Sequence, residues 1–356
     1  MKQSAKNYKR IVIKIGSSLF YSNENKLDLS VLHNLTAEIS QVVKEGKEIV
    51  IVSSGAIALG MSLLGLNLRP KELSSLQAVA AIGQNELMDI YRKFLKERQL
   101  KCGQVLLTWE DFDERARYLN AKNTLLALLK LNTIPVINEN DTVATDEIRV
   151  GDNDQLSARV ASLVSADILI VLSDVDGLLD KDKNLVRVVD KITPQIKALA
   201  FPTDKKTCVG GMITKIEAAK IAVGSGISCV IANGRNKGVI LNTLKEPGKL
   251  GTLFLSQKGY LAAKKRWIAF GTKPRGRIIV DEGAKNALMN RKSLLSVGII
   301  GTEGAFECAD VVSIADKDGC EFARGKVCLS SKHLDKVKGR RSDKEVIHCD
   351  NIVILS

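Results

Sequence analysis

Short apolar segments alternate with longer amphipathic segments between Arg10 and Gly234. The apolar segments have the length and the β-branched content that are typical of buried strands. They are RIVIKI (10–15), EIVIVS (48–53), QVLLT (104–108), TIPVIN (133–138), DILIVLS (167–173) and SCVIANG (228–234).

The intervening segments have the apolar spacing of helices. Residues 28–46 carry apolar side chains at 29, 32, 35, 39, 42 and 43, with Asp28 or Ser30 as a possible N-cap and Gly46 just past the end. Further helices are expected at 75–97, 118–131 and 154–165 and after Gly210. Strands that alternate with helices predict an α/β domain with a mainly parallel sheet covered by helices on both faces.

The pattern changes near residue 270. Short apolar runs follow at 278–280, 297–300, 311–314, 326–329 and 352–355, with one expected helix near 283–290. Such spacing predicts a small β-rich barrel. We therefore expect a first domain at 1–257, a linker at 258–276 and a second domain at 277–356.

Composition indicates an ordinary soluble protein. The chain has 356 residues, of which 45% are hydrophobic, enough for two buried cores. Its longest apolar runs, such as ILIVL, are far shorter than the roughly 20 residues that cross a bilayer. The start, MKQSAKNYKR, lacks the apolar core of a secretory signal. These features predict a cytoplasmic location without membrane association.

The positive charge lies in the larger, N-terminal part of the chain. The chain carries 53 Lys and Arg against 40 Asp and Glu, and residues 277–356 are nearly balanced with 13 against 12. Residues 1–276 therefore hold 40 against 28. This excess favours anionic ligands, although much of it is expected on solvated helix faces.

Histidine and cysteine exclude several kinds of chemistry. The three histidines are at 33, 333 and 348, so residues 34–332 offer no imidazole. The seven cysteines form no CxxC pair, which argues for reduced thiols rather than disulfides or a zinc site. An enzyme in the first domain would have to work without histidine.

Small residues follow several of the expected strands. The loops are KIGSS (14–18), SSGA (53–56) and SDVDGL (173–178), and VGGMITK (209–215) opens a helix. Glycines and helix N-termini let backbone N–H groups approach an anion closely. The chain lacks both the P-loop pattern and the GxGxxG dinucleotide pattern.

Two lysines lie among these glycines. Lys14 ends an apolar strand, and Lys215 lies in the first turn of a helix, where a cation opposes the helix dipole. A single lysine at a strand end is more often a surface charge, but two among glycine loops suit phosphoryl transfer. A carboxylate acceptor is already ionised at neutral pH and needs no general base, which fits the missing histidine.

The segment PVINENDTVATDEIRVGDNDQLSA (135–158) concentrates short polar side chains. Its carboxylates and carboxamides could hold an ammonium group and orient the two lysines. The candidates are Asn138, Asp141, Asp152, Asn153 and Asp154. The alternative is that they cap the following helix and form turns, and the residues alone leave both interpretations open.

Six segments in order resemble one known family, the bacterial glutamate 5-kinases. They are KIGSS (14–18), VSSGA (52–56), INENDTVA (137–144), VGDNDxLSA (150–158), LSDVDGL (172–178) and GGMxTK (210–215). The family has the amino acid kinase fold, and its bacterial members often carry a C-terminal PUA domain, a small pseudobarrel. The tail from Arg275, with RGRIIVDEGAKNALMNRKSLLSVGI, is similar to that domain. The resemblance covers nearly the whole chain.

The resemblance implies roles for individual residues. Lys14 and Lys215 would neutralise the transferred γ-phosphoryl group, and Asp154 would hold both lysines. The residues implied for the substrate are Ser54, Gly55 and Ala56 for a carboxylate, and Asn138, Asp141 and Asn153 for the rest of glutamate. Those implied for ATP are Lys14, Ser173, Asp174, Val209, Gly210, Gly211, Met212, Ile213, Thr214 and Lys215. Mg²⁺ would bind to the phosphates rather than to a protein site. Family members often have Thr at the positions of Ser173 and Val209.

The implied reaction converts ATP and L-glutamate to ADP and L-glutamyl 5-phosphate, the first step of proline synthesis. Family membership also implies inhibition by proline, glutamyl phosphate reductase as a functional partner, and a dimer or tetramer. Acetylglutamate kinase, aspartokinase and uridylate kinase are alternatives that the motifs and the PUA-like tail disfavour. RNA binding by the PUA-like domain, through KHLDKVKGRR (332–341), is a further alternative that its near-neutral charge disfavours.

Overall fold

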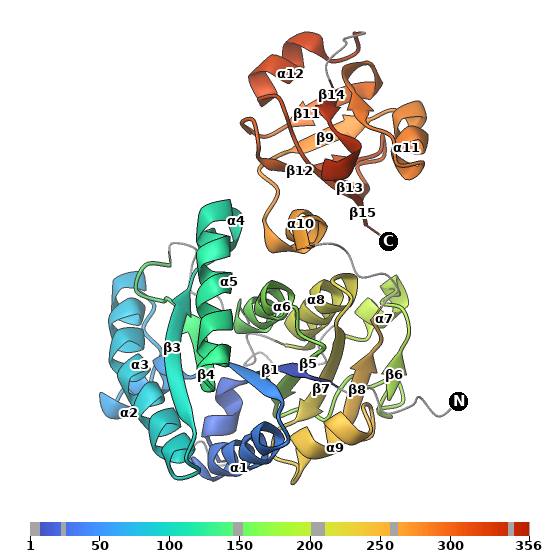
Figure 1. Cartoon of the computed structure of the whole chain (residues 1–356). Helices are drawn as coiled ribbons and strands as arrows, with labels where there is room; N and C mark the ends of the chain where they lie inside the picture. The colour runs from blue at the N-terminus through green and yellow to red at the C-terminus, as the bar shows by residue number, and fades with distance from the viewer. Residues whose placement is uncertain are drawn as a thin grey trace. The chain divides into compact units, whose positions relative to one another are not determined.

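The chain divides into two compact units, Met1–Lys258 and Gly259–Ser356. A computed structural model describes residues 8–22, 26–144, 152–200, 211–256, 263–340 and 345–355 (Figure 1). Each unit has its own hydrophobic core and is treated by itself. The finer domain limits expected from the sequence stay predictions, and residues 258–262 of the expected linker lie outside the described residues.

A sheet of eight strands forms the centre of the first unit, in the order β3-β4-β2-β1-β5-β7-β8-β6. The strands are β1 (Arg10–Ile15), β2 (Glu48–Ser53), β3 (Lys101–Leu107), β4 (Thr133–Glu139), β5 (Ile168–Ser173), β6 (Val188–Val189), β7 (Ser228–Asn233) and β8 (Gly251–Phe254). The six from β3 to β7 are parallel, whereas β8 is antiparallel to β7. The predicted mainly parallel sheet is confirmed. Strands β6 and β8 were not predicted, because two and four residues are too short for a clear pattern.

Helices cover both faces of this sheet (Figure 1). One face carries α1 (Ser30–Lys44), α3 (Leu73–Lys96) and α9 (Val239–Lys245), and the other carries α5 (Arg115–Lys130), α6 (Asp152–Val164) and α8 (Met212–Gly224). Shorter helices are α2 (Ala56–Leu63), α4 (Glu110–Asp113), α7 (Pro194–Ala198) and the 3-10 turn η1 (Ser17–Phe20). Among the helices in the described ranges, none is both long and apolar enough to cross a membrane.

The N-cap of helix α1 lies between the two residues that were expected to cap it. Its N-cap is Leu29, and the Asp28 carboxylate accepts a hydrogen bond from the backbone N–H of Ser30 at 2.9 Å. The expectation of Asp28 or Ser30 at the N-cap was therefore wrong by one residue. Asp28 still satisfies a free N–H group in the first turn, from just outside the helix.

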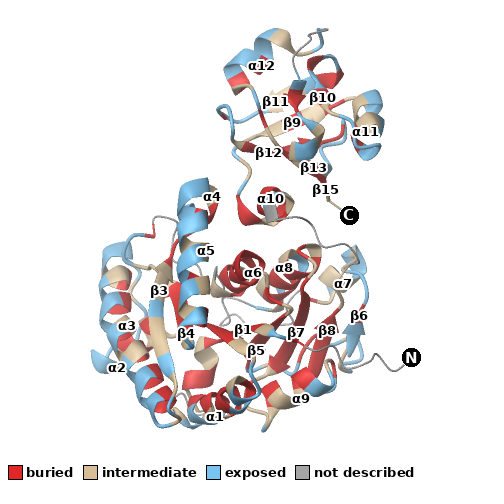
Figure 2. Cartoon of the chain, in the orientation of Figure 1, coloured by how far each residue is buried: buried red, intermediate tan, exposed pale blue. Residues whose placement is uncertain are grey.

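Strand β1 directs its residues alternately to the two faces of the sheet. Ile11, Ile13 and Ile15 belong to the core under α1, α3 and α9. Lys14 therefore points to the opposite face, where α6 and α8 lie. Figure 2 shows that the central strands are buried and that the helices expose their outer faces.

Two glycines bring α2 and α3 into backbone contact. A Cβ atom on Gly60 would lie 2.0 Å from the carbonyl oxygen of Val79, and one on Gly83 would lie 1.8 Å from that of Ala56. No larger residue fits at either position without moving a helix. This contact sets the start of α2, and with it Ser54, against the middle of α3.

The second unit is a small β-rich domain, as predicted. Its main sheet has the order β11-β9-β12-β13-β15, and β10 pairs with β14. The strands are β9 (Arg277–Val280), β10 (Leu294–Leu295), β11 (Ile299–Glu303), β12 (Val311–Ala315), β13 (Glu321–Lys326), β14 (Glu345–Ile347) and β15 (Ile352–Ile354). The helical segments are α10 (Ala263–Arg266), η2 (Trp267–Gly271), α11 (Glu282–Met289), η3 (Ser296–Gly298), α12 (Ser331–Val337) and η4 (Cys349–Asn351).

One strand expected in this unit was misplaced. The apolar run at 326–329 is not a strand, because β13 ends at Lys326. The inward residues of β13 include Ala323 and Gly325, which are too small to mark a strand by hydrophobicity. Val327 is buried in the core from the loop that follows β13.

Candidate active site

Three charged side chains meet where β1 ends and where α6 and α8 begin. Asp154, in the first turn of α6, accepts Lys14 Nζ at 2.6 Å on Oδ1 and Lys215 Nζ at 3.4 Å on Oδ2. The three residues are only 5%, 1% and 7% exposed for Lys14, Asp154 and Lys215. The structure thus brings together all three residues to which the resemblance assigned catalysis.

Burial and mutual attraction set the protonation of this cluster. Burial alone would raise the pKa of Asp154, but Lys14, Lys215 and the hydroxyl of Thr214 together lower it below its usual value. Burial is also the main reason that the pKa of Lys14 is lowered; Lys215 lowers it further, while Asp154 opposes both effects. Asp154 is therefore ionised at neutral pH, and both lysines contact this one carboxylate.

Helix α8 presents an open N-terminus beside Lys215. Its N-cap is Gly211, which has no side chain to accept the first N–H groups, and a Cβ atom there would meet no atom of the described residues within 4 Å. Free N–H groups at a helix start, together with the helix dipole, favour an anion. The hydroxyl of Thr214 lies 2.7 Å from Asp154 Oδ2 and 2.9 Å from the Gly211 carbonyl oxygen. Thr214, expected at ATP, thus also contacts the central carboxylate.

The loop after β1 approaches the end of β5. A Cβ atom on Gly16 would lie 3.2 Å from the Leu172 carbonyl oxygen and 3.5 Å from Lys14 Nζ, so a side chain would crowd the lysine. Ser173 is buried, and its hydroxyl has no partner among the described residues. Asp174 is exposed and accepts a hydrogen bond from the Ser18 hydroxyl at 3.1 Å.

The remaining residues expected at ATP lie around the start of α8. Met212 is half-buried and Ile213 is 41% exposed. Val209 and Gly210 lie outside the described residues, as does the side chain of Asp152.

A chain of polar side chains joins the start of α2 to α3. Asn153 Nδ2 donates to Ser54 Oγ at 3.1 Å and to Asn138 Oδ1 at 3.0 Å. Asn138 Nδ2 in turn donates to Gln84 Oε1 at 2.8 Å. The sequence predicted Ser54, Asn138 and Asn153 as site residues, but it did not predict Gln84. The only indication of Gln84 in the sequence was that it is a polar residue within the largely apolar stretch QAVAAIGQ.

The SSGA loop requires its glycine. Gly55 is the N-cap of α2 with φ of 114°, a conformation that other residues rarely adopt, and a Cβ atom there would lie 3.2 Å from the ring of Phe20. Ala56 is buried at the first position of α2. Ser54 therefore lies directly before the start of α2, whose N-cap, like that of α8, makes no side-chain hydrogen bond to the helix.

Asp141 lies in the turn that follows β4. It lines a cavity of about 260 Å³ whose wall also includes Gln84, Gln104 and Glu139. The sequence placed Asp141 with Asn138 and Asn153. The structure places it near them through Gln84, which both lines this cavity and bonds to Asn138.

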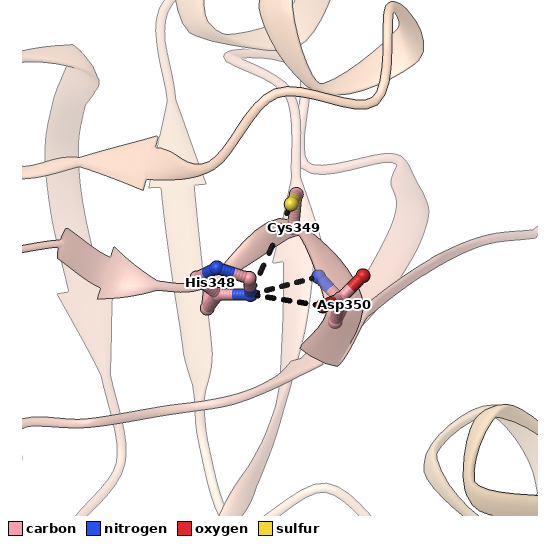
Figure 3. A group of neighbouring side chains, drawn as sticks. All are labelled: His348, Cys349 and Asp350. Carbon is pink, nitrogen blue, oxygen red and sulfur yellow. Dashed lines mark hydrogen bonds and ion pairs between the residues drawn. The ribbon is translucent and has the colours of Figure 1, made fainter.

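One group of potential metal ligands occurs in the part of the chain that the structure describes, and it belongs to the second unit. It comprises His348, Cys349 and Asp350 (Figure 3). His348 Nδ1 accepts the backbone N–H of Asp350 at 3.2 Å and so caps the short turn η4. We therefore interpret the imidazole as a structural cap.

Comparison with known proteins agrees with this geometry. The Amino acid kinase family profile matches residues 9–233, and the PUA domain profile matches residues 276–349. A glutamate 5-kinase of Caldanaerobacter subterraneus subsp. tengcongensis is 46% identical, over 97% of this chain and 98% of that protein. The chain belongs to the glutamate 5-kinase family. The predicted family, fold and kinase activity are thereby confirmed.

Other glutamate 5-kinases match over the same length. That of Rhodopseudomonas palustris is 42% identical over 99% of this chain and 97% of its own. A solved N-acetylglutamate synthase from Neisseria gonorrhoeae superposes with a TM-score of 0.53 at 16% identity, covering 70% of this chain and 60% of that one. The last similarity supports the fold alone. Matches over the whole chain favour the glutamate 5-kinases over the other kinases of this fold.

Proposed function

We propose that the chain transfers the γ-phosphoryl group of ATP to the γ-carboxylate of L-glutamate, giving ADP and L-glutamyl 5-phosphate, the first step of proline synthesis. The observation that carries this proposal is the buried cluster of Lys14, Lys215 and Asp154. Its two ammonium groups exceed its one carboxylate by one positive charge. Such a surplus stabilises the charge on a phosphoryl group during transfer.

The reaction needs no general base. An oxygen of the γ-carboxylate forms a bond to the γ-phosphorus while the bond between that phosphorus and the β,γ-bridging oxygen breaks. The electron pair of that bond remains on ADP. Lys14 and Lys215 neutralise charge on the transferred group, and Asp154 keeps both ammonium groups in place.

The proposed glutamate contacts follow from the hydrogen-bonded side chains of Ser54, Asn153 and Asn138. The Ser54 hydroxyl and the backbone of Gly55 and Ala56, at the open start of α2, would bind a carboxylate. Asn138, Asp141 and Asn153 would bind the remaining groups, including the ammonium. Asn153 Oδ1, which has no partner among the described residues, supports this role, since a buried acceptor needs a donor.

The ATP contacts follow from the ends of β1 and β5 and from the start of α8. Gly211, Met212, Ile213 and Thr214 would bind phosphate oxygens through the helix start, continuing from Val209 and Gly210. Ser173 and Asp174 would line the rest of the nucleotide site, and Lys14 and Lys215 would contact the phosphates.

Mg²⁺ fits this site as an ion bound by the phosphate oxygens of ATP. Asp154 already binds two ammonium groups, so it offers little to a metal ion. We therefore propose that the phosphate oxygens hold Mg²⁺. When bound, the ion adds positive charge along the polyphosphate.

Trapping of the acyl phosphate tests the proposed reaction. With hydroxylamine present, ATP and Mg²⁺ should yield a hydroxamate from glutamate but not from N-acetylglutamate or aspartate. Absence of hydroxamate from every carboxylate, with folded and ATP-binding protein, would contradict the proposal. Product from N-acetylglutamate instead would reassign the substrate but keep the chemistry.

The wider context is proposed from the family resemblance. We propose a cytoplasmic enzyme, a homo-oligomer (dimer or tetramer), that proline inhibits and whose product passes to glutamyl phosphate reductase. An acyl phosphate is reactive, which favours rapid reduction by such a partner. Titration of proline against hydroxamate formation tests the inhibition, and unchanged activity at millimolar proline would contradict it.

A further inference from the structure

Asn153 uses both hydrogens of its amide nitrogen within the protein. One is donated to Ser54 Oγ and the other to Asn138 Oδ1. Its own oxygen, Oδ1, is buried and has no hydrogen-bond partner among the described residues. Asn153 therefore presents an acceptor that lacks a donor, which is the complement of an ammonium group.

The hydroxyl of Ser54 has the opposite property. Its oxygen accepts from Asn153, and the described residues offer no acceptor for its own hydrogen. Ser54 is thus left as a donor, which is the complement of a carboxylate. An amino acid carries both matching groups.

This arrangement depends on the direction of the hydrogen bonds. A carboxamide that is flipped about its last side-chain bond exchanges the places of its oxygen and its nitrogen. If Asn138 were flipped, its nitrogen would face Asn153, and Asn153 would have to turn its oxygen inward to accept. Asn153 would then present a donor, which repels an ammonium group.

Gln84 is itself a carboxamide, and the structure orients its oxygen toward Asn138, in agreement with this direction. Its Oε1 accepts from Asn138 Nδ2 at 2.8 Å, which leaves Asn138 Oδ1 to accept from Asn153. Its place on α3 is well defined, because the preceding Gly83 is in backbone contact with Ala56 at the start of α2. Gln84 is therefore held close to the loop that carries Ser54.

We propose that Gln84 is a positioning residue for the substrate, which sets the direction of the chain Gln84–Asn138–Asn153–Ser54. It thereby presents an acceptor to the glutamate ammonium and a donor to a glutamate carboxylate, without contacting the reacting atoms. This inference rests on the proposed contacts of Asn153 and Ser54 with glutamate.

Three substitutions at one position test the direction of the chain. Gln84→Met removes the acceptor and should raise the KM for glutamate about tenfold, the effect of an unpaired buried amide. Gln84→Lys offers only a donor and should raise it at least as much. Gln84→Glu retains an acceptor and should keep the KM for glutamate within about threefold of wild type. In all three, kcat and the KM for ATP should stay within about threefold, because Gln84 acts through Asn138 and not through the lysines or α8.

Lys93→Met is the matched control. Lys93 lies on the same helix, α3, and is exposed, so this variant should behave as wild type. A second measurement uses glutarate, which lacks the ammonium, as a competing ligand. The preference for glutamate over glutarate should fall in Gln84→Met and Gln84→Lys but not in Gln84→Glu.

Two outcomes would overturn the inference. One is an unchanged KM for glutamate in Gln84→Lys, and the other is an equal rise in the KM of both substrates, which a general distortion would cause. If Gln84→Met does not fold, the contrast between the Lys and Glu variants still decides. Asn153→Ala separates the two proposals: an unchanged KM for glutamate there would remove the proposed contact itself. A raised KM there, with normal Gln84 variants, would remove only the role of Gln84.

Discussion

Each unit of the molecule contains an aspartate that pairs with lysine, and the two pairs differ in charge balance. In the first unit Asp154 lies between Lys14 and Lys215, at 2.6 and 3.4 Å. In the second unit Asp316 accepts Lys285 Nζ alone, at 2.9 Å. The first cluster carries a surplus positive charge and the second is neutral.

The two aspartates also differ in the groups that donate hydrogen bonds to them. Asp316 completes its hydrogen bonds with the backbone N–H groups of Asp318 and Cys320, so it closes a turn. Asp154 instead accepts from side chains, those of the two lysines and Thr214, and no side chain in the described ranges caps the N-terminus of α8 beside it. A lysine–aspartate pair is therefore no sign of function by itself. A buried cluster with more lysines than carboxylates, next to the free N–H groups of a helix start, is the stronger indication of a functional site.

Removal of a lysine should show the largest difference between the two clusters. Lys215→Ala should lower kcat for hydroxamate formation by about 10²–10³-fold, because a group that stabilises transition-state charge is lost. Lys285→Ala should leave kcat unchanged, since its loss removes no charge from the proposed site. Saturating ATP and glutamate make the comparison one of kcat. A Lys215→Ala enzyme that kept most of its activity would refute the role of the surplus charge.

Neutralising the aspartates should affect stability unequally. Asp154→Asn removes the carboxylate that both buried lysines contact, which should lower the free energy of unfolding by about 3–5 kcal/mol. Asp316→Asn should change the urea midpoint little, because an amide oxygen can still accept the N–H groups of the turn. Unfolding followed by circular dichroism measures both. Equal midpoints for the two variants would contradict the contrast.

The pH dependence of kcat/KM, which reports the free enzyme, should reveal the lowered pKa of Lys14. The protonated ammonium is the active form, so activity should fall as pH rises through a pKa below the usual lysine value of about 10.4. In Lys14→Arg the guanidinium stays charged, and the remaining activity should persist to higher pH. Profiles of kcat/KM for ATP from neutral to alkaline pH test this. If the activity of wild type and of Lys14→Arg declined over the same alkaline pH range, a group other than Lys14 would control that decline.

The smallest effect is expected for two buried serine hydroxyls that lack partners among the described residues, Ser173 and Ser313. Ser173→Ala should raise the KM for ATP about threefold through loss of one hydrogen bond. Ser313→Ala, in β12 of the second unit, should leave it unchanged. Steady-state kinetics at varied ATP separates the two variants. If both matched wild type, ATP would not use the Ser173 hydroxyl.

Much of the site was predictable because it lies where the fold places ligands. Lys14, Ser54 and Ser173 lie at or just past the ends of parallel strands, and the carboxyl ends of such strands meet at one edge. Glycine-rich spacing marked the helix start at Lys215. Asp154 stood out as a carboxylate directly after a loop rich in polar residues, although the residues alone left a capping role open.

Other features had no sequence signal. Helix α2 was not separated from the loop before α3, and β13 was missed because Ala323 and Gly325 face the core. The hydroxyl of Thr214 was expected at ATP, but it also contacts Asp154. Which atom a short side chain reaches depends on helix packing at the scale of an ångström, and spacing in the sequence does not specify that distance.

By itself the sequence determined the alternation of strands and helices, the two units, and the glycines that open the helix starts. These are local properties, set by side-chain periodicity and backbone sterics. Only the tertiary structure decided that one carboxylate lies between two lysines from distant parts of the chain, and that Gln84 reaches Asn138. Both contacts arise because elements distant in the chain pack closely: β1, α6 and α8 in the first case, and α3 and β4 in the second.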